Sequence, residues 1–158
     1  MVIRPYRDDD LGAVLDVWYR ASLIAHSFLS EEFLSEERRE IGERWLPMAE
    51  TTVCEIDGSV VGFLSLIGNE VGAIFVDPDC QGRGIGRILM DGARDSRPFL
   101  ELSVFEANSA GRGFYEAYGF EFAGRQVNQD TGFPELRLRL SGGRGKYGST
   151  DVPEGPPT

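Results

Sequence analysis

Hydrophobic residues recur along this chain with two periods, one helical and one extended, and the two alternate from the N-terminus onward. Residues 2–6 predict a short strand. A helical stripe follows, formed by Leu11, Val14, Leu15, Trp18, Ser22 and Ala25. The aspartates at positions 8–10 stand directly before this stripe and predict the N-cap of its helix. Such alternation favours an α/β fold.

A second helix is predicted from Ser30, because a serine followed by two glutamates caps a helix and suits the positive end of its dipole. We expect this helix to reach Trp45 or Leu46. Pro47 should end it, since proline disfavours a helical conformation in the residue before it.

Strands are predicted from residue 51 onward. Residues 52–56 and 60–66 indicate two strands, and Asp57 with Gly58 between them is a strong signal for a two-residue hairpin turn. Residues 71–76 predict a third strand, which ends at Asp77.

Helices and strands alternate again in the second half of the chain. An amphipathic helix is indicated by Ile85, Ile88, Leu89 and Ala93. Residues 99–105 predict a strand, and residues 109–118 predict a short helix that ends at Gly119. Residues 120–127 and 135–140 predict an antiparallel pair.

The composition changes after Leu140. Residues 141–158 are rich in glycine and proline and hold a single aliphatic residue, Val152. Such a segment buries too little apolar area to offset its ordering entropy, so we expect a disordered tail after a domain of residues 1–140.

The bulk composition narrows the class of protein. A chain of 158 residues with 41% hydrophobic residues suits one soluble domain. The start has no signal-peptide pattern and no apolar run approaches the roughly 18 residues of a membrane helix, so we expect a cytoplasmic protein. Cys54, Cys80 and the single histidine, His26, are too few and too far apart to indicate a metal site.

The net charge of −10 argues against a nucleic-acid partner, because phosphate contacts need a basic surface. It favours a cationic ligand such as an amine or a lysine side chain. An acidic balance is also a common solubility device, so both interpretations stay open.

Three glycines stand in the segment Gln81–Gly86, between the third predicted strand and the amphipathic helix. Glycine lets successive backbone N–H groups turn toward one point without interference from Cβ. The following helix adds unpaired N–H groups and its positive dipole end, and Arg83 and Arg87 add charge. This glycine loop therefore predicts a cradle for a pyrophosphate.

Several ligands are compatible with the glycine loop alone. A Walker A loop needs Gly-Lys-Ser/Thr after its last glycine, and here Arg87 and Ile88 follow. A Rossmann fingerprint needs a third glycine at position 87, although Glu101 lies at a distance typical of its ribose contact. A plain tight turn is the structural alternative.

Two further segments lie downstream of the loop. Residues 102–108 end in Asn108, and residues 113–120 read Gly-Phe-Tyr-Glu-Ala-Tyr-Gly-Phe; together they form a second block. In order and separation, the loop and this block resemble motifs A and B of the GNAT superfamily of acetyltransferases: a Gln/Arg-x-x-Gly-x-Gly/Ala loop, then Asn and Phe-Tyr-x-x-x-Gly-Phe. The resemblance covers residues 1 to about 140. Residues 19–34, which include His26, look further like the bacterial YjaB-type branch.

The resemblance implies a GNAT fold, an α/β (α+β) domain with a strongly bent mixed β-sheet of six to seven strands flanked by about four helices. Two parallel strands, here 71–76 and 99–105, would splay apart and admit the pantetheine arm of acetyl-CoA. It also implies an N-acetyltransferase that acts without a metal on a primary amine, of a small molecule or of a peptide lysine or N-terminus. The cofactor-binding residues implied are Ile74, Phe75, Val76, Gln81, Gly82, Arg83, Gly84, Ile85, Gly86, Arg87, Asn108 and Tyr115.

Tyr115 occupies the position that supplies a proton to the leaving CoA thiolate in related enzymes, and the backbone N–H of Val76 is a candidate to stabilise the oxyanion. Helical geometry separates Phe114 from Tyr115 by about 100°, which favours Phe114 as core anchor and leaves Tyr115 to face the cofactor. An aromatic core role for Tyr115 is the alternative. Asn108 would contact the pantetheine or simply cap the next helix.

The general base departs from the common pattern. Many relatives carry a glutamate within the strand before the loop, but residues 72–74 here are Gly, Ala and Ile, and Glu70 lies too early. His26, which would titrate near neutrality, is one candidate. A water chain to Glu101, Ser103 or His26 is another, and a merely packed or exposed histidine is the alternative for His26.

The acceptor and the assembly stay open at this level. Residues 20–35 mix apolar side chains with Glu31 and Glu32, which favours an amine with an apolar body. The missing strand glutamate keeps a non-catalytic acetyl-CoA-binding or regulatory module as the alternative. A nucleotide-dependent oxidoreductase is the least favoured, and either a monomer or a homodimer is expected.

Overall fold

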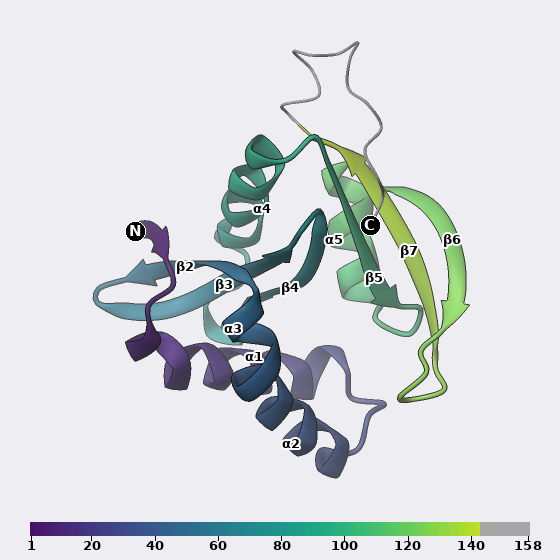
Figure 1. The fold of residues 1–158 in the computed structure, drawn as a ribbon, viewed down its shortest axis with the longest axis horizontal. Helices are drawn as coiled ribbons and strands as arrows, with labels where there is room; N and C mark the ends of the chain where they lie inside the picture. Colours follow the sequence, from purple (N-terminus) through teal and green to yellow (C-terminus); the bar gives the residue numbers. More distant parts are fainter. Residues whose placement is uncertain (143–158) are drawn as a thin grey trace. The chain divides into compact units, whose positions relative to one another are not determined.

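The computed structural model describes residues 1–142, which form a seven-stranded mixed sheet and its helices (Figure 1). The strands are β1 (Val2–Pro5), β2 (Glu50–Ile56), β3 (Ser59–Ile67), β4 (Glu70–Val76), β5 (Phe99–Phe105), β6 (Glu121–Val127) and β7 (Pro134–Ser141). They are ordered β1-β2-β3-β4-β5-β7-β6. Within the described residues the helices of ten residues or more are α1 (Leu11–Ala25), α2 (Glu31–Glu40), α4 (Ile85–Ser96) and α5 (Ser109–Tyr118). The predicted mixed α/β architecture, with its number of strands and helices, is confirmed.

The chain divides into two compact units. The first comprises Met1–Ile67 and Gly72–Met90, and the second comprises Gly68–Val71 and the described residues from Asp91 onward. β4 and α4 therefore each contribute residues to both units.

The first unit pairs β1, β2 and β3 in antiparallel fashion and packs α1 against β3 and α2 (Figure 1). The hairpin between β2 and β3 turns at Asp57 and Gly58, whose φ angles of 52° and 82° match the mirror-image turn that the sequence predicts. The core is built from Val14, Val17, Trp18, Leu34, Leu46, Val53 and Phe63.

The N-cap of α1 lies at one of the predicted aspartates, but its side chain makes other contacts than a capping bond. Asp10 holds the N-cap position, but its carboxylate makes no capping bond to the helix. It accepts instead from the backbone N–H of Arg7 at 2.8 Å and from the Arg4 guanidinium at 2.8 and 2.9 Å. The charged, bidentate guanidinium is a stronger partner than a neutral N–H, so Asp10 joins α1 to β1.

The predicted end of the second helix at Pro47 is wrong. α2 ends at Glu40, a π-helical turn follows over Ile41–Trp45, and a short helix α3 (Leu46–Met48) includes the proline. Proline is tolerated in the first turn of a helix, where its missing N–H has no partner to lose. The predicted Ser30 cap is confirmed, since its hydroxyl accepts from the N–H of Phe33 at 3.0 Å.

The second unit pairs β5, β7 and β6 in antiparallel fashion. One face buries the leucines Leu100, Leu102, Leu138 and Leu140. The register places hydrophilic residues on the opposite face, which we call the polar face: Glu101, Ser103, Gln126, Glu135, Arg137 and Arg139. β4 joins β5 in parallel at Glu70, opposite Glu101.

The ends of α5 and of β7 can be compared with the boundaries predicted from the sequence. Gly119 closes α5 with a φ of 121° and donates its N–H to the carbonyls of Tyr115 and Glu116, as expected for a glycine cap. Ser141 still belongs to β7, and the N–H of Gly142 donates to the carbonyl of Pro98 at 2.8 Å. The remainder of the predicted tail lies outside the described residues.

Candidate active site

The glycine loop (Gln81–Gly86) leads from the end of β4 into α4 within the first unit. Gly82 and Gly84 have φ angles of 83° and 82°, a conformation that costs any other residue about 1–2 kcal/mol. No atom lies within 4 Å of a Cβ built at either position, so the space beside both glycines is open. The carbonyl of Gly84 accepts the first helical bond of α4 from the N–H of Ile88 at 3.0 Å, so the loop leads directly into the N-terminal turn of a helix, where anions commonly bind. This geometry fits a pyrophosphate.

Ile85 has a different role from its loop neighbours. Its side chain is buried, whereas Arg83 and Arg87 are exposed. A Cβ at Gly62 of β3 would lie 3.1 Å from the Ile85 side chain and 3.3 Å from the Phe75 carbonyl oxygen. Gly62 therefore permits the close approach of α4 to β3. Nothing in the local sequence pattern marks this strand glycine, so its role could not be predicted.

An ion pair holds the start of the loop. Asp77, just after β4, accepts from both terminal nitrogens of the Arg20 guanidinium at 3.0 and 2.6 Å. Arg20 lies on α1, which joins the loop to that helix. The Asp77 carboxylate also accepts from the N–H of Asp79, and the Arg20 guanidinium holds the pKa of Asp77 below its usual range. Sequence reasoning did not identify this pair, because 57 residues separate its partners.

The predicted residues at the end of β4 lie together with the loop and with His26. The side-chain amide of Gln81 donates to the carbonyl of Val76 at 3.2 Å. The Phe75 ring stacks on Phe63 at 5.9 Å and meets the His26 ring edge-on at 6.2 Å. Ile74, Phe75 and Val76 are all half-buried.

His26 is a packed residue whose ring also contacts Phe28 at 5.9 Å. Burial lowers its pKa to about 4, because the charged imidazolium loses solvation. The expectation that His26 titrates near neutrality is therefore wrong. At neutral pH the ring is an uncharged imidazole.

Asn108 and Tyr115, the two remaining predicted residues, belong to the second unit. The Asn108 side chain accepts from the N–H of Gly111 at 2.9 Å, which confirms its helix-capping role. A Cβ at Gly111 would lie 2.5 Å from the Asn108 amide nitrogen, so a larger residue there would displace the capping side chain. Gly111 is not among the residues predicted from the sequence.

Tyr115 is half-buried on α5, with its ring 5.4 Å from Phe114 and 5.6 Å from Phe120. Burial raises its pKa above the ordinary value of a phenol, since the phenolate would lose solvation. Tyr115 therefore holds its proton at neutral pH. Phe114 is half-buried as well, and Tyr118 is the buried aromatic of this helix, so the predicted contrast between Phe114 and Tyr115 does not appear in their burial.

The carboxylates named as proton acceptors are held by arginines. Arg137 donates to both carboxylate oxygens of Glu70 at 2.7 and 3.0 Å, and to Glu101 at 3.3 Å. It also donates to the Ser103 hydroxyl at 3.0 Å. Arg139 donates to the second oxygen of Glu101 at 2.7 Å. Glu70 and Glu101 are therefore both engaged in ion pairs within the second unit.

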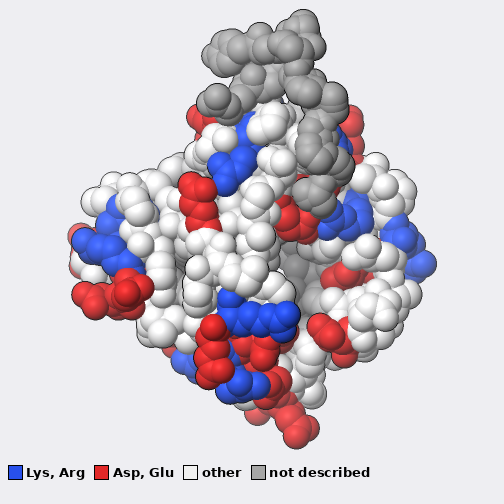
Figure 2. Space-filling model, in the orientation of Figure 1, with Lys and Arg blue, Asp and Glu red and all other residues white. Residues whose placement is uncertain are grey.

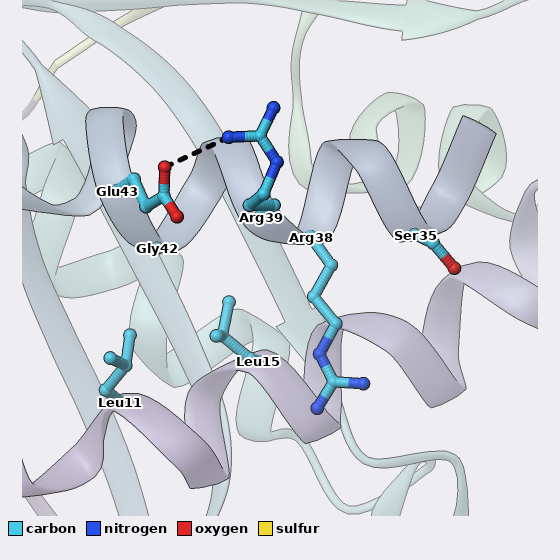
Figure 3. Close-up of a pocket in the computed structure, with 7 residues that line it drawn as sticks. All are labelled: Leu11, Leu15, Ser35, Arg38, Arg39, Gly42 and Glu43. Carbon is cyan, nitrogen blue, oxygen red and sulfur yellow. Dashed lines mark hydrogen bonds and ion pairs between the residues drawn. The ribbon is translucent and has the colours of Figure 1, made fainter. Parts of the chain in front are cut away.

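A separate surface groove of about 380 Å³ lies between α1 and α2 in the first unit (Figure 3). It is lined by Leu11, Leu15, Ser35, Arg38, Arg39, Gly42 and Glu43. In Figure 3 the two leucines face the groove from α1. The opposite wall holds both Arg39 and Glu43, which are joined by a hydrogen bond. None of the predicted site residues lines it, so the groove does not mark the chemistry.

Three further properties concern possible partners. On the face drawn in Figure 2, basic and acidic side chains are intermixed. Residues 1–142 hold no group of three or more His, Cys, Asp or Glu side chains that could bind a metal ion. No helix in this part of the chain is both long enough and apolar enough to cross a membrane.

Comparison with known proteins decides the family. The model of the acetyltransferase (GNAT) domain matches residues 47–122. The peptidyl-lysine N-acetyltransferase YjaB of Salmonella typhimurium is 35% identical over 139 residues, which are 87% of this chain and 95% of that protein. This chain belongs to the GNAT family. Like other GNAT proteins it is an N-acetyltransferase that takes its acetyl group from acetyl-CoA.

Solved GNAT structures show the same fold. The solution structure of apo YjaB from Escherichia coli matches with a TM-score of 0.80 and 34% identity, over 90% of this chain and 99% of that one. The PaiA N-acetyltransferase of Thermoplasma acidophilum, solved with coenzyme A, has a TM-score of 0.74 at 20% identity and covers 89% and 98% of the two chains. The predicted likeness to the YjaB-type branch of the GNAT family is confirmed.

Proposed function

We propose that this GNAT chain acetylates the ε-amino group of lysine in a peptide or protein. The observation that carries the acceptor class is the similarity to peptidyl-lysine N-acetyltransferases over nearly their whole length. The net charge of −10 agrees with it, because an acidic protein attracts a cationic lysine side chain. The proposal includes the cytoplasmic location predicted from the sequence, and a monomer or homodimer as the working form.

In this proposal the glycine loop holds the pyrophosphate of acetyl-CoA. Gly82 and Gly84 supply the conformation, the first turn of α4 supplies N–H donors, and the exposed Arg83 and Arg87 supply charge. Acetyl-CoA, when bound, supplies a thioester carbonyl that an amine can attack. The end of β4, from Ile74 to Val76, would hold the pantetheine arm, and the Val76 N–H would donate to the carbonyl oxygen as it gains negative charge.

Tyr115 is the proposed general acid. Its raised pKa keeps the phenol protonated, and a group that must donate a proton has to carry one at the working pH. The proton would go to the CoA thiolate, whose pKa resembles the roughly 8.5 of cysteine. Asn108 supports this indirectly, because its cap fixes the first turn of the helix that carries Tyr115.

His26 is proposed to shape the acceptor side and not to remove the proton. An imidazole with a pKa of about 4 is a weak base toward a lysine ammonium, whose pKa is about 10.4. Its ring packs edge-on against Phe75, which places it beside the proposed pantetheine strand. We propose that water takes the proton from the amine.

The test is acetyl transfer by the purified full chain to a panel of lysyl peptides, α-amino peptides and small amines. Released CoA thiol gives the rate, and mass spectrometry locates the acetyl group. Lys146 is the only lysine of the chain, so a Lys146→Arg background removes acetylation of the enzyme's own lysine. We expect lysyl peptides to be the best acceptors. CoA binding without transfer to any amine would instead favour a non-catalytic acetyl-CoA-binding module.

A further inference from the structure

Glu135 is a buried carboxylate on the polar face of the second unit. It is the second residue of β7, and only 8% of its surface is exposed. One of its oxygens accepts from the side-chain amide of Gln126 and the other from that of Asn128, both at 2.9 Å. Within residues 1–142, none of its recorded contacts is with an arginine or lysine.

The neighbouring carboxylates differ in this respect. Glu70 and Glu101 are neutralised by Arg137, and Glu106 pairs with Arg125 at 2.9 Å. Desolvating an ionised carboxylate costs several kcal/mol unless a cation compensates it. Glu135 is desolvated too, but its partners are neutral amides, so a cation from outside the chain would gain most at this position.

The carboxylate is also held in place before any ligand arrives. The Asn128 side-chain oxygen accepts from the N–H groups of Asp130 and Thr131 at 2.9 Å, which turns its amide nitrogen toward Glu135. The loop between β6 and β7 is closed by the N–H of Asn128, which donates to Phe133 at 2.9 Å. A fixed acceptor loses little conformational entropy when it binds a donor.

The position in the sheet points to a ligand site. Glu135 lies opposite Phe105, the last residue of β5, and the N–H of Glu106 donates to the carbonyl of Pro134 at 2.9 Å. Open parallel α/β sheets bind ligands outside the carboxyl ends of their strands, and β5 runs parallel to β4. The same end of β5 leads through Asn108 into α5, which carries Tyr115.

We propose that Glu135 binds the ammonium group of the acceptor lysine. This rests on the proposed function, because it assigns the acceptor site of that reaction. A carboxylate has about four lone-pair positions, of which the two amides use two, and an ammonium group offers three donors. Glu135 would hold the charged amine at the carboxyl end of β5, while Gln126 and Asn128 keep the carboxylate oriented.

The test uses the Glu135→Gln variant and two acceptors that differ in charge. At pH 9 a lysine side chain is mostly charged, with a pKa of about 10.4, whereas a peptide α-amino group is mostly neutral, with a pKa of about 7.7–8.0. We expect the KM for a lysyl peptide to rise at least tenfold. The KM for an α-amino peptide without lysine should change less than threefold, and the KM for acetyl-CoA less than twofold.

Glu121→Gln is the matched control, because Glu121 is an exposed carboxylate on β6 and should leave all three constants unchanged. An equal loss for both acceptors in Glu135→Gln would show a structural role and overturn the inference, as would no loss at all. If the wild-type chain acetylates neither acceptor, the proposed function fails by itself. Glu135 is then judged by whether the CoA-loaded protein binds a lysyl peptide more tightly than its Nε-acetylated form, and whether the variant loses that preference.

Discussion

In the proposed function, the glycine loop of the first unit binds its ligand through backbone N–H groups, whereas the polar face of the second unit binds through side chains. The loop depends on two residues with positive φ and on the first turn of one helix, all within six consecutive positions. The polar face combines residues of β5, β6 and β7, with partners up to 67 positions apart, as in the pair of Arg137 with Glu70. Backbone recognition is visible in a short segment of sequence, while side-chain recognition requires the folded sheet.

The same difference governs charge. The loop adds two exposed arginines to N–H dipoles and suits an anion. On the polar face Arg137 and Arg139 neutralise Glu101, and Arg137 also neutralises Glu70 of β4, whereas Glu135 is left for a cation. Acetyl-CoA and the acceptor amine have opposite charges, and the two regions match them separately.

The largest expected effect concerns the loop. Gly84→Val forces a β-branched residue into a φ of 82°, which costs about 1–3 kcal/mol, and places a side chain where the ligand would lie. We expect the Kd for CoA, measured by calorimetry, to rise at least 30-fold. The control is Gly92→Ala in α4, the helix that follows the loop, where a Cβ meets no atom within 4 Å. It should leave the Kd unchanged, and similar Kd values for Gly84→Val and wild type would contradict backbone recognition.

The next effect concerns Tyr115 of the second unit, the proposed general acid. Tyr115→Phe removes the phenolic proton and keeps the ring that packs on Phe114 and Phe120. We expect kcat to fall at least tenfold with the Kd for acetyl-CoA unchanged, because general acid catalysis contributes about 10²-fold or more. Unchanged turnover in a steady-state assay would refute the role.

A smaller effect tests whether the polar face is held by its arginine. Arg137→Met leaves Glu70, Glu101 and Ser103 without their shared donor, and the Arg137 side chain is 25% exposed. We expect the free energy of unfolding in urea to fall by about 1–2 kcal/mol, with the Kd for CoA unchanged. Arg139→Met is the control, since its more exposed pair with Glu101 should contribute about 0.5 kcal/mol or less. An equal loss in both variants would mean that burial does not distinguish the two ion pairs.

The smallest effect concerns His26, whose ring packs against Phe75 of β4. Its pKa falls from about 6.5 in the unfolded chain to about 4 in the folded one, so between these values the unfolded state binds more protons. Stability should therefore decrease as pH falls from 6.5 to 4, and His26→Leu should flatten this slope by about 1 kcal/mol per pH unit or less. Denaturation at several pH values measures it. A kinetic inflection near pH 6.5 that disappears in the variant would show that His26 titrates normally.

Sequence reasoning reached the elements and the cofactor motif because both depend on local chemistry. The Asp57-Gly58 turn, the Ser30 cap, the Asn108 cap and the Gly119 end each need particular residues at particular positions, and each is present in the structure. The predicted contacts at a helix start were wrong where a residue distant in sequence bound the capping side chain instead. Asp10 bonds to Arg4 of β1, and that arginine could not be assigned to it before the strand was placed beside the helix.

The sequence by itself determined the alternation of helices and strands, the glycine loop and the Asn108–Tyr115 block, since each of these is encoded within a few neighbouring residues. Only the tertiary structure decided that the Ile85 side chain packs against Gly62, that Asp77 forms an ion pair with Arg20, and that burial makes His26 a weak base. It also decided which carboxylates are neutralised and which one is not. The physical reason is that desolvation and ion pairing depend on distance in space, and residues far apart along the chain become neighbours only when the strands pair.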